Sequence, residues 1–261
     1  PWREEVVRGL MGADVIGFHL ESNARNFLEL ATRLGLEVTG EVSTRDITAG
    51  IKVDGRTVGV GAFPISIKSS DMTRFSKAED RDVAKLRAEF GGHHRVILGV
   101  DRLDYTKGIL QRLKAFEELQ ESQALDPSEV TLVQIATPSR ERIDHYRVTR
   151  SQVEEAVGRI NGRFGQIGRP VVHYVHRAVD KDMLRKYYRL ADVMLVTPFK
   201  DGMNLVAKEY VACHDDGRGA LVLSEFAGAA AELKQANLCN PFDIESIKRA
   251  LLSALKALDD S

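Results

Sequence analysis

Two carboxylic acids, Asp201 and Glu209, flank the start of an apolar helical run in the stretch DGMNLVAKEY. The backbone N–H groups of residues 204–206 would open this helix, and the first N–H groups of a helix have no acceptor inside it. Such free N–H groups suit a diphosphate. Glu209, about one turn further along, suits the hydroxyl groups of a sugar, because its carboxylate would repel a phosphate. The alternative is a Glu209 that pairs with Lys208 or faces solvent.

Two cations lie five residues apart in the stretch DRLDYTKGI, which follows a predicted strand. Arg102 and Lys107 fall in a loop before a helix and not on a polar helix face. A guanidinium and an ammonium group beside a helix N-terminus add to its amide dipoles, so the two residues predict a phosphate site. The spacing alone is equally compatible with surface ion pairs to Asp101 and Asp104.

A third cation, Arg140, comes after the second predicted strand, in the stretch ATPSRERIDHY. It is a candidate for a second phosphate, and an ion pair with a neighbouring acid is the alternative. No metal site is predicted, because His173 and His176 point to opposite faces of a strand. Cys213 and Cys239 also lack partners at metal-site spacing. The sequence therefore predicts an anion site that uses cationic side chains.

These residues must be positioned by a fold, and the chain repeats one sequence pattern that indicates which fold it is. A short β-branched run is followed by a loop with glycine or polar residues and then by a helical period of 3.6. Apolar strands that alternate with amphipathic helices predict an α/β fold with a doubly wound, Rossmann-like parallel sheet. Ligands bind such sheets outside the carboxyl ends of the strands, where the loops above are expected. The predicted strands cover residues 95–100, 130–136, 171–175, 192–197 and 220–224, with a helix after each, the last at 227–236.

The first part of the chain, residues 1–64, does not follow this pattern. The stretch ADVIGFHL predicts a strand, SNARNFLELATRLGLE a helix, and IKVDGRTVGVGAFP a β-hairpin with Asp54 and Gly55 at its turn. An antiparallel hairpin does not belong in a serial βα sheet. We therefore place a domain boundary near Pro64, with 1–64 as the last part of another α/β domain and 65–261 as the doubly wound domain.

The composition indicates a chain with a sizeable core and little net charge. The 261 residues are 43% hydrophobic, and 37 Lys and Arg balance 38 Asp and Glu. The net charge of -1 gives no bulk attraction to nucleic acid or to an anionic membrane. No apolar run approaches the roughly 18 residues of a membrane span. Two cysteines in a chain of this size favour a reducing, cytoplasmic setting.

Five stretches, in this order and at these separations, resemble the trehalose-6-phosphate synthase family: VDRLDYTKGI, TPSRERIDHY, EAVGRINGRFG, TPFKDGMNLVAKEYVAC and LSEFAGAAAEL. The resemblance covers essentially the whole chain. It implies a GT-B fold, in which two Rossmann-like domains face each other, and a retaining glycosyltransferase activity. The implied reaction transfers glucose from a nucleotide sugar, commonly UDP-glucose, to glucose 6-phosphate. Its product is alpha,alpha-trehalose 6-phosphate, and it needs no metal or other cofactor.

The resemblance also implies roles for individual residues. Asp201 would contact the transferred glucose, and Arg140 the phosphate of glucose 6-phosphate. Val179 stands at a position that is often Phe in the family and that contacts the base through its backbone, so base preference stays open. Arg102 and Lys107 would bind the donor's diphosphate and stabilise the negative charge that develops on it. The rest of the donor would be held by Asn204, Leu205, Val206, Ala207, Lys208 and Glu209, with Glu209 on the ribose hydroxyls.

Several matters stay open at this point. The chain is expected to lack most of the family's N-terminal half and its final helix, so that it would bind the donor but lose most catalysis. The alternatives are a related GT-B glucosyltransferase with another acceptor, such as a glucan synthase, and a non-catalytic sugar-phosphate-sensing module. The sequence does not decide between UDP, ADP and GDP in the donor, nor whether the chain forms a homo-oligomer. Small-molecule substrates are the expected partners.

Overall fold

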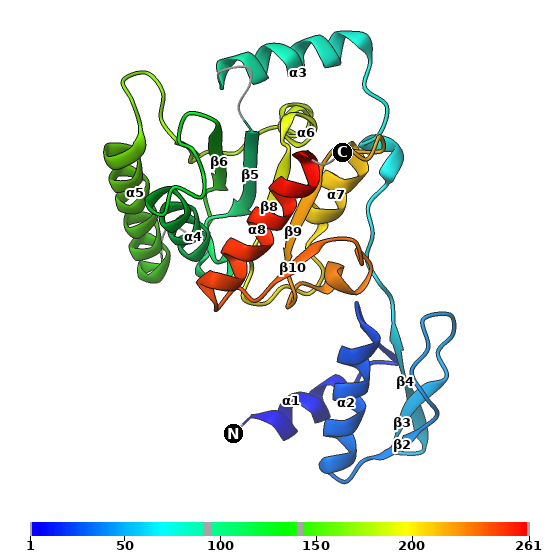
Figure 1. Cartoon of the computed structure of the whole chain (residues 1–261). Helices are drawn as coiled ribbons and strands as arrows, with labels where there is room; N and C mark the ends of the chain where they lie inside the picture. Colours follow the sequence, from blue (N-terminus) through cyan, green and yellow to red (C-terminus); the bar gives the residue numbers. More distant parts are fainter. Residues whose placement is uncertain (1, 91–94, 140–142, 260–261) are drawn as a thin grey trace. The chain divides into compact units, whose positions relative to one another are not determined.

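The computed structural model describes residues 2–90, 95–139 and 143–259. The chain divides into two compact units, Pro1–Ser66 and Ile67–Ser261 (Figure 1). The domain boundary that the sequence predicts, near Pro64, falls close to this division. Each unit has its own sheet, and we describe the two units separately.

The first unit is a four-stranded mixed sheet with the order β1-β4-β3-β2. Strand β1 runs parallel to β4, while β3 and β4 form the predicted antiparallel hairpin. Both turn residues have a positive φ, 48° at Asp54 and 79° at Gly55, as a type I′ turn requires. Apolar side chains of the two helices and the sheet form its core. The elements are α1 Arg3–Leu10, β1 Val15–Phe18, α2 Glu21–Arg33, β2 Glu37–Thr39, β3 Ala49–Val53 and β4 Arg56–Ala62.

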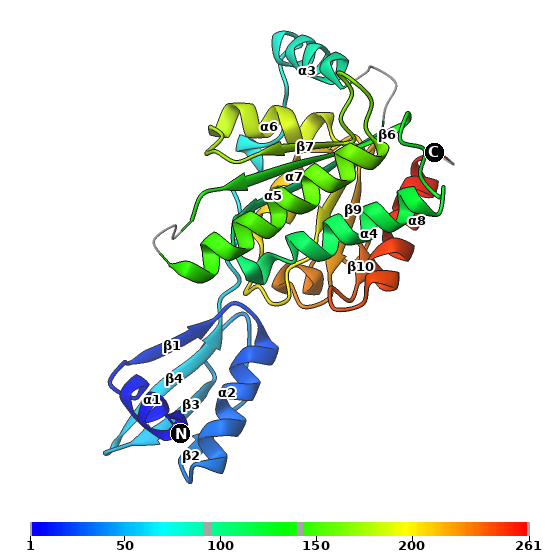
Figure 2. The same ribbon diagram turned by 90° about the vertical axis from the view of Figure 1, so that its left-hand side faces the viewer.

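The second unit is a six-stranded sheet with the order β10-β9-β8-β5-β6-β7, in which all neighbouring strands are parallel (Figures 1 and 2). The chain starts in the middle at β5, builds outward through β6 and β7, and then returns to β8 on the other side of β5. The strand order thus reverses between β5 and β8, which is the topological switch point of this fold class. The strands are β5 Arg95–Arg102, β6 Val130–Thr137, β7 Val172–Val175, β8 Val193–Val196, β9 Ala220–Ser224 and β10 Asn237–Cys239.

Helices cover both faces of this sheet, as the doubly wound fold predicts (Figures 1 and 2). Helices α4, α5 and α8 pack together on one face over the main hydrophobic core, while α6 and α7 form the layer on the other face and α3 packs on α6. Strands covered on both faces are apolar throughout, and every residue of β8 is buried. The helices are α3 Lys77–Glu89, α4 Ile109–Glu121, α5 Asp144–Phe164, α6 Lys181–Leu190, α7 Leu205–Cys213 and α8 Ile244–Asp259.

The segment after β9 differs from the prediction. The helix expected at 227–236 is only the short 3-10 helix η3, Gly228–Ala231, and the chain then enters a sixth strand, β10, that the sequence did not predict. Tertiary contacts account for the difference. The N–H of Gly228 donates to the carbonyl of Asp201 at 3.0 Å, and that of Ala229 donates to the carbonyl of Met203 at 2.7 Å. These bonds fix the start of the segment against the loop after β8, and the pairing of Asn237–Cys239 with β9 then takes the chain into the sheet.

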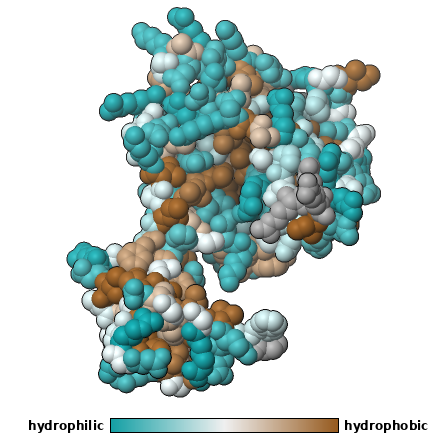
Figure 3. Space-filling view, turned by 180° about the vertical axis from the view of Figure 1, so that it is seen from behind, coloured by the Kyte–Doolittle hydropathy of each residue, from teal (hydrophilic) through white to brown (hydrophobic). Residues whose placement is uncertain are grey.

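The face of the molecule shown in Figure 3 is largely polar. In the face that Figure 3 shows, hydrophilic side chains cover most of the second unit and apolar side chains gather in a narrower stretch. Within the described ranges, no helix combines the length and the apolar character that a membrane crossing needs.

Candidate active site

The loops that follow β5 and β8 meet at the carboxyl end of the sheet, on the two sides of the switch point. They bring together two predicted site residues that are 94 positions apart: Lys107 Nζ donates a hydrogen bond of 2.6 Å to Asp201 Oδ2. The side chains are 15% and 16% exposed, so this ion pair is largely shielded but still open to a ligand. The geometry places a cation and an anion where ligands bind in this fold class.

The turn that carries Lys107 is held by its own side chains. The carboxylate of Asp104 accepts hydrogen bonds from the backbone N–H of Thr106 at 2.9 Å and from its hydroxyl at 2.8 Å. This cap starts the short 3-10 helix η2, Tyr105–Lys107. Asp104 Oδ2 also accepts a hydrogen bond of 3.1 Å from the hydroxyl of Tyr146. Burial raises the pKa of Asp104, but these hydrogen bonds outweigh it and leave the pKa below its usual value.

Gly108 lets the two loops approach each other. Its φ is 64°, and a Cβ at this position would lie 2.1 Å from the carbonyl oxygen of Thr197. A backbone hydrogen bond of 2.8 Å from the N–H of Phe199 to the carbonyl of Thr106 joins the same loops. Only glycine combines this backbone conformation with so close a contact. The distance between Lys107 and Asp201 is therefore set by backbone packing.

Several hydrogen bonds hold Asp201 in place. Its carboxylate accepts hydrogen bonds from Lys107, from the side-chain amide of Asn204 at 3.2 Å and from the N–H of Met203 at 3.3 Å. Its own N–H donates to the carbonyl of Phe226 at 3.2 Å. The carboxylate is thus oriented before any ligand arrives.

Helix α7 begins beside Asp201 with an unusual cap. Asn204 has a φ of 74°, and its side-chain oxygen accepts a hydrogen bond of 3.1 Å from the N–H of Ala207. The sequence predicts the amide of Asn204 among those that open the helix, whereas in the structure Asn204 is the N-cap. The amides of Leu205 and Val206 remain as the helix-opening N–H groups without an acceptor inside the helix.

Among the described residues, Glu209 does not pair with its neighbour Lys208, and it is half-buried, so neither alternative for it, the ion pair or a solvent-facing side chain, describes it. The ammonium group of Lys208 binds both carboxylate oxygens of Glu232 at 2.9 Å. Glu209 is half-buried, and its Oε2 accepts a hydrogen bond of 2.9 Å from the hydroxyl of Tyr188. The carboxylate therefore lies one turn into α7, held from α6.

The alternative for Arg102 and Lys107, pairing with Asp101 and Asp104, is wrong. Within the described residues, neither cation forms an ion pair with either acid. Asp101 is instead buried and binds Arg112 at 2.8 Å. Burial raises the pKa of Asp101, and the guanidinium of Arg112 opposes that rise. Arg102 is exposed at the end of β5.

Arg112 is the centre of a buried polar network beneath the site. The residue is fully buried, and besides Asp101 it donates to Gln134 Oε1 at 2.7 Å and to the hydroxyl of Thr197 at 3.3 Å. The hydroxyl of Thr197 in turn donates to the carbonyl of Gly108 at 3.2 Å. This network joins β5, β6, α4 and the loop after β8 directly below the ion pair of Lys107 and Asp201.

Two further predicted site residues are Val179 and Arg140. Val179 lies in the segment between β7 and α6 and is half-buried. Arg140 falls outside the described residues. Among residues 2–90, 95–139 and 143–259, no three His, Cys, Asp or Glu side chains gather closely enough to hold a metal ion.

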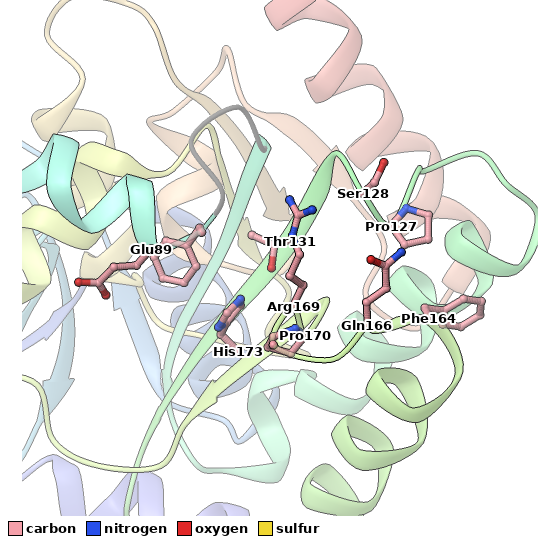
Figure 4. A pocket seen from close by; sticks show the side chains of 11 residues that line it. Glu89, Pro127, Ser128, Thr131, Phe164, Gln166, Arg169, Pro170 and His173 are labelled. Carbon is pink, nitrogen blue, oxygen red and sulfur yellow. The ribbon is translucent and has the colours of Figure 1, made fainter.

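A pocket opens at the opposite end of the same sheet (Figure 4). Its lining includes Thr131 near the start of β6 and Pro170 and His173 around the start of β7. These residues lie at the amino ends of the strands, whereas the cluster around Lys107 lies at the carboxyl ends. The pocket is therefore away from the candidate site.

Comparison with known families decides what kind of chain this is. The model of glycosyltransferase family 20 matches residues 1–261. This chain belongs to glycosyltransferase family 20. A trehalose-6-phosphate synthase of Mycolicibacterium vanbaalenii is 53% identical to this chain over 259 residues. The match covers 98% of this chain and 53% of that protein.

Solved structures of family relatives confirm the predicted GT-B fold class. An alpha,alpha-trehalose-phosphate synthase (UDP-forming) from Burkholderia xenovorans, in complex with glucose-6-phosphate, has a TM-score of 0.89 and 36% identity; the match covers 99% of this chain and 56% of that one. An E. coli protein bound with UDP-2-fluoro glucose has a TM-score of 0.84 and 36% identity, over 98% and 56% of the two chains. The N-terminal domain of Candida albicans trehalose-6-phosphate phosphatase has a TM-score of 0.85 and 30% identity, over 97% and 53%. This chain spans about half the length of these relatives.

The sequence did not point to two polar residues of the candidate site, Arg112 and Tyr188. Each lies within a helix, where the helical period indicates only whether a side chain faces solvent or the core and does not indicate its hydrogen-bond partner. Their partners are distant in sequence: Thr197 is 85 residues from Arg112, and Glu209 is 21 residues from Tyr188. No local pattern reports such contacts, so only the assembled sheet and helices show them.

Proposed function

We propose that this chain forms the donor-binding part of a UDP-forming trehalose-6-phosphate synthase. The complete enzyme would transfer glucose from UDP-glucose to glucose 6-phosphate with retention, giving alpha,alpha-trehalose 6-phosphate. The observation that carries the proposal is the meeting of Lys107 and Asp201 at the switch point, beside the N-terminus of α7. Relatives named as trehalose-6-phosphate synthases cover nearly all of this chain and support it.

The donor's diphosphate would lie between the loops after β5 and β8. Arg102 and Lys107 supply positive charge, and the amides of Leu205 and Val206 supply hydrogen-bond donors at the positive end of α7. Asp201 would accept hydrogen bonds from the glucose hydroxyls. Glu209 is too far along the helix for the same phosphate and would accept them from the ribose.

Breaking the bond between the glucose C1 and the phosphate oxygen develops negative charge on the leaving diphosphate. Arg102, Lys107 and the helix amides are in place to stabilise this charge before the reaction begins. In the proposed mechanism the acceptor hydroxyl attacks from the face of the leaving group, and its proton passes to the departing phosphate oxygen. This route retains the configuration at C1 and needs no pair of protein carboxylates of the glycosidase kind.

We further infer that the reaction proceeds without a metal, since the two cationic side chains supply the charge that would neutralise the diphosphate. A chelator such as EDTA should then leave the transfer rate of the full-length protein unchanged. Loss of activity with EDTA and its return with a divalent cation would contradict this inference. The proposed role of Arg140, binding the phosphate of glucose 6-phosphate, rests on the family resemblance.

Calorimetry on the chain tests the proposal. UDP and UDP-glucose should bind, and Arg102→Ala and Lys107→Ala should each weaken binding about ten-fold or more, because each removes a charge-assisted hydrogen bond to phosphate. Lys114→Ala is the matched control, since Lys114 is an exposed cation on α4 that forms a long ion pair of 3.9 Å with Glu118. Equal affinities in all four proteins, or no binding by the unaltered chain, would refute the proposal.

The acceptor is tested separately, with the full-length protein that contains this chain. Transfer to glucose 6-phosphate and not to glucose or to a glucan supports the proposed synthase. A preference for the glucan would favour the alternative of a glucan synthase, which has no phosphate for Arg140 to bind.

A second function remains a candidate because one relative with this fold is named as a phosphatase's N-terminal domain. The fold can therefore occur in a protein that is not named as a synthase. A module that binds sugar phosphate without transferring glucose fits that observation. Binding of glucose 6-phosphate by the full-length protein, with no transfer from UDP-glucose, would favour this function over the synthase.

A further inference from the structure

Tyr188 contacts the candidate site from below, although nothing in its sequence surroundings marks it. It lies near the end of α6, is fully buried, and donates its hydroxyl hydrogen to Glu209 Oε2 at 2.9 Å. Helix α6 packs directly against α7, so both partners are held by well-packed elements. The contact joins a buried neutral donor to a half-buried carboxylate.

The phenol of Tyr188 is a permanent donor. Burial raises its pKa above the usual value, and the neighbouring carboxylate of Glu209 raises it further, so the hydroxyl keeps its proton. A hydrogen bond from a neutral hydroxyl to a carboxylate is charge-assisted and stronger than one between neutral groups. The bond therefore restricts the rotamers of Glu209, whose side chain is otherwise flexible.

The bond leaves part of the Glu209 carboxylate available. A carboxylate has two oxygens and about four acceptor positions, of which Tyr188 occupies one. The nearest cation in sequence, Lys208, binds Glu232 and leaves the other acceptor positions of Glu209 unoccupied by its ammonium group. Glu209 can thus accept further hydrogen bonds from a ligand without losing Tyr188.

We propose that Tyr188 is a positioning residue that holds the carboxylate of Glu209 ready for the two vicinal hydroxyls of a ribose. The proposal rests on the donor site proposed above, and it deepens that site by assigning its preference for a ribonucleoside diphosphate. A side chain fixed before binding loses less conformational entropy when the ligand arrives. Tyr188 would therefore raise affinity only for ligands that carry the ribose hydroxyls.

The test compares UDP with 2′,3′-dideoxy-UDP, which keeps the base and the diphosphate but lacks both hydroxyls. The unaltered chain should bind UDP more tightly. In Tyr188→Phe this preference should fall by about 3- to 10-fold, because Tyr188 acts on the ribose only through Glu209 and the loss corresponds to the net contribution of one ordinary intramolecular hydrogen bond. The affinity for dideoxy-UDP should stay unchanged, and in a Glu209→Ala background Tyr188→Phe should have no further effect on the preference.

Tyr210→Phe is a matched control. Tyr210 lies next to Glu209 on α7 and is 1% exposed, but its hydroxyl donates to the backbone carbonyl of Asp192 at 3.0 Å. The substitution is the same and the burial is the same, but the hydroxyl that is removed does not touch the carboxylate. In Tyr210→Phe the ratio of the affinity for UDP to the affinity for dideoxy-UDP should therefore match the ratio in the unaltered chain. This should hold even if thermal unfolding shows that the variant is less stable.

The outcomes separate the inference from the function on which it rests. If Tyr188→Phe weakens both ligands equally, or changes only the unfolding temperature, Tyr188 has a structural role and the inference is wrong while the donor site stands. If the unaltered chain binds both ligands equally well, Glu209 does not read the ribose and the inference is also wrong. If the unaltered chain binds neither ligand, the proposed donor site itself fails.

Discussion

Lys107 Nζ lies 2.6 Å from Asp201 Oδ2, across the point where the strand order of the sheet reverses. The two residues have opposite proposed tasks, since Lys107 would bind the diphosphate and Asp201 the glucose. Because the two groups already neutralise each other, neither has to be buried as a lone charge while the site is empty. A nucleotide sugar would then be recognised by inserting its phosphate and its hydroxyls between two preplaced groups.

Replacing Asp201 should separate these two tasks. In Asp201→Asn, UDP should bind at least as tightly as to the unaltered chain, because Lys107 is released from its carboxylate partner. The additional affinity that UDP-glucose gains from its sugar should fall about ten-fold, in line with a lost hydrogen bond to a charged group. Calorimetry with both ligands measures the difference. An equal loss for UDP and UDP-glucose would show that Asp201 supports the site as a whole.

Arg112 should matter chiefly for stability. Arg112→Met leaves Asp101 buried without its guanidinium partner, and breaking a buried pair in this way typically costs about 3–5 kcal/mol of unfolding free energy. Urea denaturation followed by circular dichroism measures this loss. Arg249→Met is the control, because the Arg249 side chain is 70% exposed and should shift stability by no more than about 0.5 kcal/mol. Similar midpoints for the two variants would contradict the expectation.

Gly108→Ala should disturb both stability and ligand binding. The new Cβ would meet the carbonyl of Thr197 at 2.1 Å, so the loops after β5 and β8 must move apart and Lys107 must leave Asp201. Gly217→Ala is a matched control, since Gly217 also has a positive φ, 74°, but has open space around it. Both variants should lose about 1 kcal/mol from backbone strain. Only Gly108→Ala should lose more than that and weaken UDP binding; equal effects would show that the close contact is unimportant.

His214 should make the chain less stable in mild acid. Burial lowers the pKa of His214 below its usual value of about 6.5. Between the folded and unfolded pKa values the unfolded chain binds a proton that the folded chain does not, so the stabilisation is present above about pH 6.5 and is lost as the pH falls. Denaturant titrations at pH 7.5 and 5 should show a smaller loss of stability in His214→Gln than in the unaltered chain. An identical loss in both would contradict this prediction.

Much of the second unit could be predicted because its signals are local. Apolar runs such as the one that became β8, and the helical periods after them, show in a short window of sequence. The residues from Gly228 to Cys239 could not be predicted in this way. Their conformation depends on hydrogen bonds of Gly228 and Ala229 to the loop that holds Asp201, and on the pairing of Asn237–Cys239 with β9.

The candidate site was also predictable only in part. The types and spacing of Arg102, Lys107, Asp201 and Glu209 were visible in the sequence, as was their place after strands of a parallel sheet. The sequence by itself thus determined the fold class, the end of the sheet to examine and the kind of ligand to expect. Only the tertiary structure decided which charges meet. In the structure Lys107 binds Asp201, Arg112 binds Asp101, and Tyr188 donates a hydrogen bond to Glu209. The sequence alone does not show these contacts, because each of them joins different elements across the sheet or between packed helices.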